Sequence, residues 1–328
     1  MNFRTTFNID PSSRKISYND PAMFIGSCFA SSIGKQMEIG RMPVMINPAG
    51  AVYNPVSVYD NIDMIINNKV FDSDDLYNNN GTYLSFFHNT EYSSWDPEKV
   101  LNSINAKTVE AHTFIQSSKF LFITFGTARI YRLEKNGVIV SNCHKLPSDF
   151  FIPDLLSIDE IVSLWSGLLE KLNTIYPELK VVFTISPVRH WKDGAHGNQV
   201  SKSVLFLAVE ELLKHPSSPG YFPAYELVMD DLRDYRFYDD DMLHPSSEAV
   251  KYIWNAFTAS YFDNKTQEIW KEVVKITKAA EHQLLTDSPS GAAKFAEKML
   301  KNIKTVTGKV PTIDLNREKD YFLALLTK

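Results

Sequence analysis

The chain has 328 residues, 44% of them hydrophobic, with a net charge of −5 and an isoelectric point near 5.9. This composition supports a sizeable buried core, which excludes a generally disordered protein, and the lack of a basic run argues against nucleic acid as a partner. No stretch reaches the roughly 18 apolar residues that a membrane span needs, and the first residues carry no signal-peptide segment. Two cysteines, Cys28 and Cys143, are too few for a disulfide scaffold, so we expect a cytoplasmic protein.

The first predicted element is a short strand at residues 23–25, which breaks at Gly26-Ser27 and leads into a helix that begins near residue 30. The next predicted elements are a loop with a short strand at 40–56, a helix at 56–67, a polar, Asn-rich excursion at 71–95 and a helix at 99–117.

The clearest strand covers residues 119–125, and a second apolar strand covers 180–187. Their near-continuous apolar runs suit strands that are buried on both faces of a parallel sheet. The other predicted elements are a hairpin built on 130–133 and 138–140, helices at 157–175, 201–214 and 245–262, a short strand within 221–229, and mainly helical structure over 266–328 with a break at 288–291. Because strands alternate with helices, the predicted class is α/β with a mostly parallel sheet.

Polar residues follow three of the predicted strands, as Gly26-Ser27, Gly126-Thr127 and Ser186-Pro187. In such sheets, sites collect at the carboxyl ends of the strands. One polar strand end is ordinary because it meets solvent, but three of them together favour an active site at this edge.

Ser27 lies at the predicted strand-to-helix turn, where a nucleophile is exposed and the helix N-terminus favours developing negative charge. Its own backbone N–H can donate to an oxyanion. The alternative is a serine that only caps the helix. Cys28, next to it, is interpreted as a small buried hydrophobe, although a thiol at a helix N-terminus can also be reactive.

Asp241 and His244 form the strongest local pattern, because a carboxylate three residues before a histidine can reach the imidazole across a turn. Pro245 then begins a helix, which places His244 in the loop at the rim of the sheet. The alternative is a surface pair in an acidic loop. Ser27, Asp241 and His244 therefore form a candidate catalytic triad.

The sequence Gly26-Ser27-Cys28-Phe29-Ala30 spells the motif that names the GSCFA family, which the chain resembles over roughly residues 20–262. Four more stretches carry the resemblance: FGTARIY at 125–131, SNCHKLP at 141–147, SPVRHWKDG at 186–194 and DMLHPS at 241–246. That family resembles the SGNH (GDSL-like) hydrolases, which implies a flavodoxin-like α/β/α sandwich. It also implies Ser27 as nucleophile, Asp241 as the residue that orients the imidazole and His244 as base.

The chain departs from the SGNH pattern at the oxyanion site. Where that pattern has Gly-x-Asn-Asp, this chain has Gly126-Thr127-Ala128-Arg129, so the donor asparagine is missing. Thr127 or Asn142 is a candidate replacement, and Gly50 matches the second glycine of the pattern by spacing only. Loss of one such donor typically lowers the rate about 10²–10³-fold, so a competent enzyme needs a substitute.

Two further clusters suit substrate binding. Asn142 and His144 are expected near the substrate, while Arg189 suits an anion or a sugar hydroxyl and His190 lies beside it. Asn198, Ser201 and Lys202 begin the next predicted helix and are expected to line the same cleft. A metal site is the disfavoured alternative, because Cys143, His144, His190 and His196 lack a metal-binding motif.

The resulting hypothesis is a serine esterase that works through an acyl-serine without cofactor or metal, on a small-molecule or carbohydrate ester such as an O-acetyl group. An O-acyltransferase and a non-catalytic binding protein remain as alternatives. We expect a catalytic domain at 1–262 and a helical extension at 263–328, which either covers the sheet or mediates a homo-oligomer.

Overall fold

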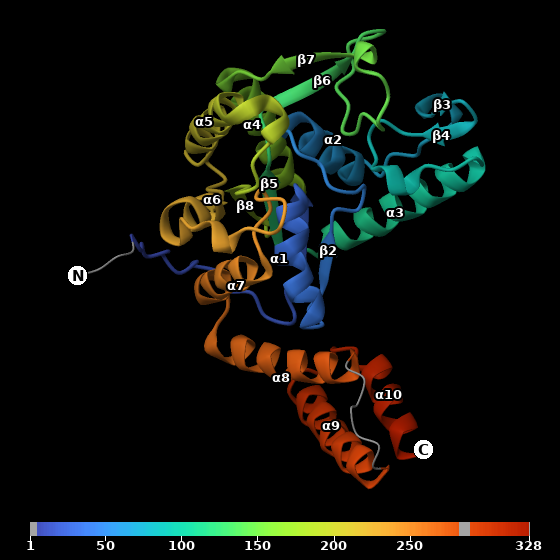
Figure 1. Cartoon of the computed structure of the whole chain (residues 1–328), viewed down its shortest axis with the longest axis vertical. Coiled ribbons are helices and arrows are strands. Elements are labelled where there is room, and N and C mark those ends of the chain that lie inside the picture. Colours follow the sequence, from blue (N-terminus) through green and yellow to red (C-terminus); the bar gives the residue numbers. More distant parts are fainter. Residues whose placement is uncertain (1–4, 282–288, 328) are drawn as a thin grey trace.

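The computed structural model describes residues 5–281 and 289–327 of the chain. Its central sheet has five parallel strands in the order β2-β1-β5-β8-β9 (Figure 1). These strands are β1 (Ala22–Gly26), β2 (Val44–Ile46), β5 (Phe120–Phe125), β8 (Lys180–Ile185) and β9 (Gly220–Tyr221). This is the strand order of flavodoxin-like sheets, which reverses between β1 and β5 and favours a site there. The predicted α/β class is confirmed.

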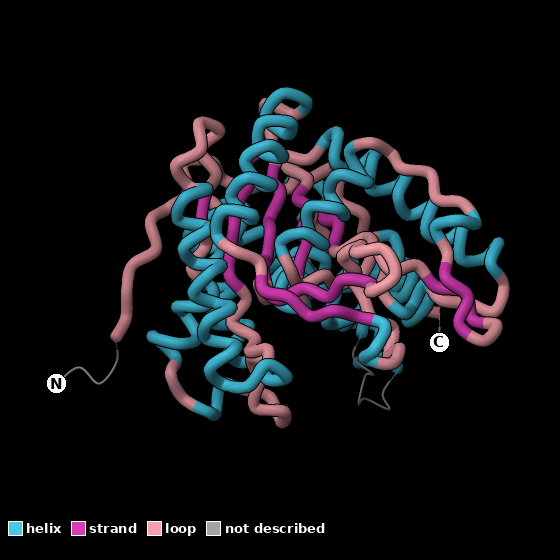
Figure 2. Tube along the Cα trace, turned by 90° about the horizontal axis from the view of Figure 1, so that it is seen from above, coloured by secondary structure: helices cyan, strands magenta, loops and turns pink. Residues whose placement is uncertain are grey.

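Helices cover both faces of this sheet because side chains alternate along each strand. Along β1, Phe24 joins one buried cluster, while Met23 and Ile25 join the other. The first cluster includes residues of α1 (Cys28–Ile39), α6 (Ala224–Glu226) and α7 (Ser247–Tyr261). The second includes residues of α2 (Pro55–Ile66), α3 (Pro97–Ser117), α4 (Ile158–Ile175) and α5 (Gly194–Leu212). Seen from above, helices flank the strands on both sides, which confirms the three-layer sandwich (Figure 2).

The predicted hairpin at 130–140 is replaced by a longer-range pairing. β6 (Arg129–Leu133) pairs antiparallel with β7 (Phe151–Leu155), whereas Ile139 forms only an isolated bridge with Arg132. The expected turn does form, because the Leu133 N–H donates to the Val138 carbonyl oxygen over 2.8 Å. A second hairpin, of β3 (Tyr77–Asn79) and β4 (Thr82–Leu84), lies within the predicted polar excursion.

The prediction of a strand within residues 221–229 is wrong. β9 ends at Tyr221, and the following chain forms α6 and then a π-helical turn at Leu227–Leu232. Ala224 and Val228 are buried four positions apart, as are Val228 and Leu232, which is a helical spacing. Short apolar runs do not distinguish helix from strand by themselves, and here tertiary packing selected the helix.

Three helices follow the sandwich: α8 (Asn264–Glu281), α9 (Pro289–Lys309) and α10 (Asn316–Leu326). α8 packs on the C-terminal end of α1, where the Trp270 indole N–H donates to the Gln36 carbonyl oxygen over 2.9 Å. Figure 1 shows the three helices at the end of the molecule that lies away from β6 and β7. Of the predicted break at 288–291, Ser288 lies outside the described residues, and α9 begins at Pro289. The boundary at residue 262 stays a prediction.

Within residues 5–281 and 289–327, no helix combines the length and the hydropathy that crossing a bilayer requires.

Candidate active site

A thiol, an imidazole and a carboxylate form a chain of contacts at the carboxyl edge of the sheet. The Cys28 Sγ lies 3.3 Å from the His244 Nε2, and the His244 Nδ1 lies 2.5 Å from the Asp241 Oδ2. A proton on Nδ1, shared with the carboxylate, leaves Nε2 as an acceptor that faces the thiol. This is the arrangement of nucleophile, base and orienting acid that acyl-transfer sites use.

The turn from Asp241 to His244 holds the imidazole in place. The Asp241 Oδ1 accepts hydrogen bonds from the backbone N–H groups of Leu243, at 2.8 Å, and His244, at 2.9 Å. Met242 adopts a positive φ of 60°, which tightens the turn. The pKa of Asp241 falls to about 2, first because of the His244 backbone N–H and then because of its imidazole. Asp241 is therefore ionised throughout the neutral range.

Ser27 occupies a different place from the one that the triad hypothesis requires. It is only 1% exposed and caps α1, with its Oγ accepting a hydrogen bond from the Phe29 N–H over 3.3 Å. Within the described chain, neither ring nitrogen of His244 is hydrogen-bonded to Ser27. The capping role is thus observed, whereas the expected contact between Ser27 and His244 is not formed. The nucleophilic role of Ser27 stays a prediction.

Cys28 is the residue that sequence reasoning set aside. Its half-buried thiol has a pKa above the usual value, first because of burial, although the backbone N–H groups at the start of α1 act in the opposite direction. A neutral thiol needs a base to become a nucleophile, and His244 is in position. The sequence did contain a signal, because Cys28 lies at the N-terminus of a predicted helix, where a thiol can be reactive.

The expected oxyanion donors are bonded within the protein. The backbone N–H groups of Gly126 and Thr127 both donate to the Tyr53 carbonyl oxygen, at 2.7 and 3.1 Å, and that of Gly50 donates to the Asn47 carbonyl oxygen. The Thr127 hydroxyl pairs with the Ser201 hydroxyl at 2.9 Å. Their assignment to an oxyanion hole stays a prediction. Sequence reasoning also missed Tyr53, whose phenol pKa is raised by burial and by the nearby Cys28.

Asn142 and His144 are turned toward another segment. The Asn142 Oδ1 accepts from the His144 backbone N–H over 2.8 Å, and the His144 Nε2 lies 2.9 Å from the Ser85 carbonyl oxygen. Burial lowers the pKa of His144, which favours the neutral imidazole. Neither residue forms a hydrogen bond with Cys28 or His244 within the described chain. Their assignment to the substrate site remains a prediction.

His190 and Arg189, by contrast, lie near the contacts that join Cys28, His244 and Asp241. The His190 ring packs edge-on against Tyr53 with 5.7 Å between centroids, and burial lowers the pKa of its imidazole. Arg189 and Asp241 line the same pocket. Among the described residues, no group of three or more His, Cys, Asp or Glu side chains is arranged to hold a metal ion.

Lys202 links two strand ends beneath the site. It is 1% exposed, and its ammonium donates to the carbonyl oxygens of Gly126 and Ser186, each at 2.6 Å. Burial lowers its pKa to about 7, while Cys28 acts in the opposite direction. The side chain therefore joins the carboxyl ends of β5 and β8 and lies within electrostatic range of the thiol.

Comparison with known proteins gives one family and a set of distant structural likenesses. The model described as "GSCFA family" matches residues 21–257. A presumed GDSL-like lipase from Parabacteroides merdae matches with a TM-score of 0.39 and 10% identity, over 77% of this chain and 98% of its own. A carbohydrate esterase of family 3 from Talaromyces cellulolyticus matches with a TM-score of 0.34 and 10% identity, over 77% and 99%. No curated protein matches the sequence.

Proposed function

Because the chain belongs to the GSCFA family, whose name contains the cysteine that faces His244, we propose that it is an acyl-transfer enzyme with Cys28 as its nucleophile. The reaction is hydrolysis of an ester, with an acetylated carbohydrate or small hydroxylated metabolite as the substrate class. The observation that supports this most is the 3.3 Å contact from the Cys28 Sγ to the His244 Nε2, continued by Asp241.

In the first half-reaction, the His244 Nε2 takes the thiol proton as the Cys28 Sγ attacks the ester carbonyl carbon. The carbonyl oxygen becomes an oxyanion at the N-terminus of α1, where the helix dipole stabilises negative charge. The intermediate collapses when the C–O bond breaks, and the imidazolium gives its proton to the leaving alcohol. The product of this step is an S-acyl thioester on Cys28.

In the second half-reaction, the His244 Nε2 takes a proton from water as the water oxygen attacks the thioester carbonyl. The C–S bond then breaks, the thiolate is reprotonated by the imidazolium, and a carboxylic acid leaves. Asp241 stays ionised and holds the imidazole orientation throughout. An alcohol in place of water gives acyl transfer, so dependence of turnover on an added alcohol distinguishes the transferase from the hydrolase.

The adjacent residues Ser27 and Cys28 provide a matched test. With a short-chain nitrophenyl ester, we expect Cys28→Ala to abolish turnover and His244→Ala to lower it by about 10²–10⁴-fold. Ser27→Ala should keep most of the activity and lose about 1 kcal/mol of stability as a helix cap. Peptide mapping by mass spectrometry should find a hydroxylamine-sensitive acyl group on Cys28. An acyl group on Ser27, or a Cys28→Ala variant that turns over normally, would contradict the proposal.

A further inference from the structure

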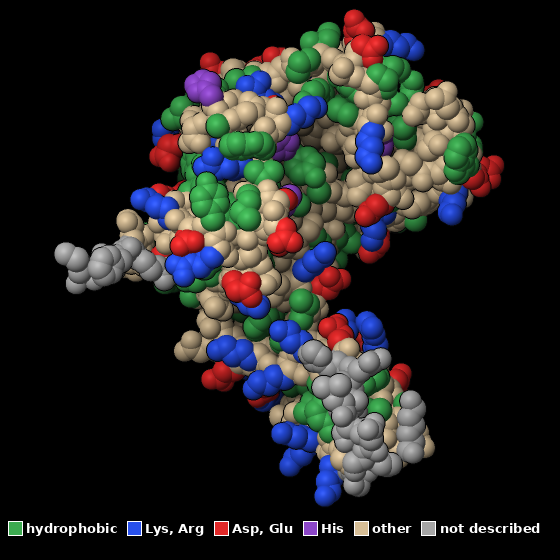
Figure 3. Space-filling view, viewed as in Figure 1, with side chains coloured by type: hydrophobic (Ala, Val, Ile, Leu, Met, Phe, Trp, Pro, Cys, Tyr) green, Lys and Arg blue, Asp and Glu red, His purple; other side chains and the backbone are tan. Residues whose placement is uncertain are grey.

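A pocket of about 500 Å³ opens beside Asp241. Its walls come from the loop after β8, the π-helical turn and the segment that leads to His244, and they are mostly apolar or aromatic. The lining residues that bear on its charge are Arg189, Met229, Arg233, Asp234, Tyr238 and Asp241. In the space-filling view, hydrophobic side chains gather over α6 next to a hollow in the middle of this face (Figure 3). A ligand seated here would reach the residue that orients the base.

Among the described residues that line this pocket, one cation lies without an anion. Arg233 pairs with Asp230 at 3.2 Å, Asp234 pairs with Arg236 at 3.0 Å, and Asp241 pairs with His244. Arg189 has no carboxylate within 4.0 Å in the part of the chain that the structure describes. A half-buried guanidinium without a counter-ion is a ready partner for an oxyanion.

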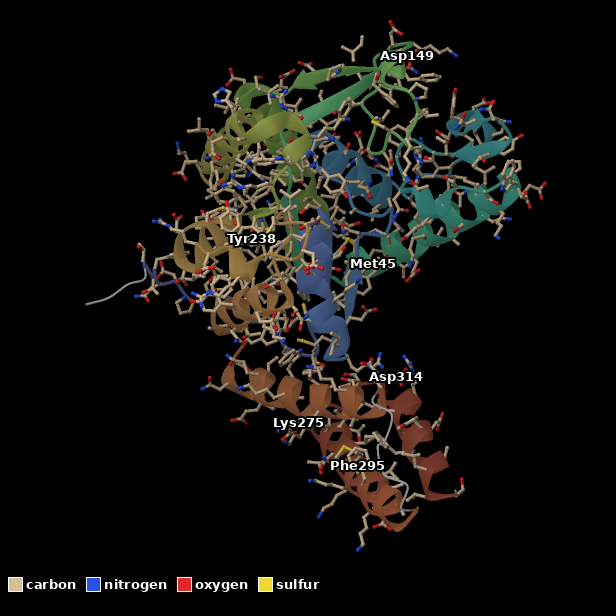
Figure 4. The ribbon with its side chains drawn as sticks, viewed as in Figure 1. Met45, Asp149, Tyr238, Lys275, Phe295 and Asp314 are labelled. Carbon is tan, nitrogen blue, oxygen red and sulfur yellow. The ribbon has the colours of Figure 1, made fainter. Side chains whose placement is uncertain are left out.

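Two donors converge on a weak acceptor at the pocket wall. The Arg189 Nη2 lies 3.9 Å from the Met229 Sδ, and the Tyr238 hydroxyl lies 3.6 Å from the same sulfur. A thioether is among the weakest acceptors in proteins, so both donors would gain from an oxygen anion. Tyr238 belongs to the segment between α6 and α7 (Figure 4).

We propose that this pocket binds a carboxylate or phosphate on the substrate, with Arg189 as its charge partner, Tyr238 as a second donor and the apolar walls around the flat or aliphatic body that carries the anion. The substrate would then be an anionic ester. The ester part rests on the proposed function, whereas anion binding in the pocket does not.

The kinetic test compares phenyl acetate with 4-acetoxybenzoate, which differ by one carboxylate. In the wild-type protein we expect kcat/KM to be about ten-fold or more higher for the anionic ester. This is the fold-change that one charge-assisted hydrogen bond typically produces. Arg189→Gln should remove this preference by lowering kcat/KM for the anionic ester more than for phenyl acetate. Arg233→Gln, in the same pocket but already paired, should retain the preference. Equal preference in the wild type and in Arg189→Gln would overturn the proposal.

A binding test does not depend on the chemistry. Titration of Cys28→Ala with benzoate, phenyl phosphate and benzyl alcohol should show binding of an anion but not of the alcohol, and the stronger anion identifies the group. Arg189→Gln in the same background should weaken anion binding by about ten-fold or more. Anion binding without turnover of any ester would reject the proposed function and keep this pocket assignment. Equal binding of benzoate and benzyl alcohol would reject the pocket assignment alone.

Discussion

The side-chain amine of Lys202 is buried between the ends of two strands, where it donates hydrogen bonds to backbone carbonyl oxygens. An amine whose pKa falls to about 7 on burial is mostly neutral in the native state at pH 8–9, whereas the unfolded chain keeps it protonated up to about pH 10. The unfolded state therefore binds more protons between these values. Stability from this group rises with pH over that interval and is at its lowest below pH 7.

Replacing the amine should remove this dependence. Between pH 7 and pH 9, we expect the free energy of unfolding of the wild type to rise relative to that of Lys202→Met. The expected rise is up to about 1.4 kcal/mol per pH unit. Urea denaturation at the two pH values measures it. The exposed Lys251→Met on α7 is the control, and its difference should not change. The prediction would be contradicted if the difference in free energy of unfolding between wild type and Lys202→Met were the same at pH 7 and pH 9.

At the scale of the elements, the end of β1 passes close to the backbone of β5 at Gly26. Gly26 has a φ of 142°, and a Cβ built on it would lie 2.1 Å from the Thr124 carbonyl oxygen, which is backbone and cannot move aside. The next two residues are Ser27 and Cys28. The missing side chain therefore sets where α1 starts and where the thiol lies.

We expect Gly26→Ala to lower the free energy of unfolding by at least about 3 kcal/mol, because both the backbone conformation and the contact become strained. Gly167→Ala is the matched control: it lies in α4 with nothing within 4 Å of the added methyl, and it should stabilise by up to about 1 kcal/mol. Chemical denaturation of both variants checks this. A Gly26→Ala variant as stable as wild type would show that the strands can separate.

The elements that the sequence predicted well carry their signals locally. The α4 helix has a capping box between Ser157 and Glu160, and β5 and β8 are continuous apolar runs. The β6–β7 pairing and the helix after β9 depend on partners that are distant in sequence, so no local pattern identifies them. The choice between Ser27 and Cys28 is of the same kind, because the cap residue and the first helical residue point in different directions and only the packing of α1 decides which one meets His244.

At the scale of the whole molecule, the C-terminal helices are held to the sandwich by a buried ion pair between Arg41 and Glu318. Glu318 is 2% exposed, whereas Arg41 reaches the surface. Removing only the cation leaves a buried carboxylate without its counter-ion, which is the costly half of such a pair.

We expect Arg41→Met to destabilise the protein by about 3 kcal/mol or more, and the double variant Arg41→Met with Glu318→Met to recover much of that loss. The control is Lys309→Met, which breaks an exposed pair with Glu272 and should change stability by less than about 1 kcal/mol. Thermal unfolding of the four proteins measures this. A double variant less stable than Arg41→Met would indicate that the ion pair itself, and not the unpaired carboxylate, decides the outcome.

The α1 helix has a mechanical role that follows from its two ends. Its first residue is Cys28, whose thiol faces His244, while the carbonyl oxygens of Gln36 and Ile39 near its last turn accept hydrogen bonds from Trp270 and Thr277 of α8. Twelve residues of helix make a stiff rod about 18 Å long. A force that displaces the C-terminal helices therefore acts on α1, the helix that also sets the distance from the Cys28 Sγ to the His244 Nε2.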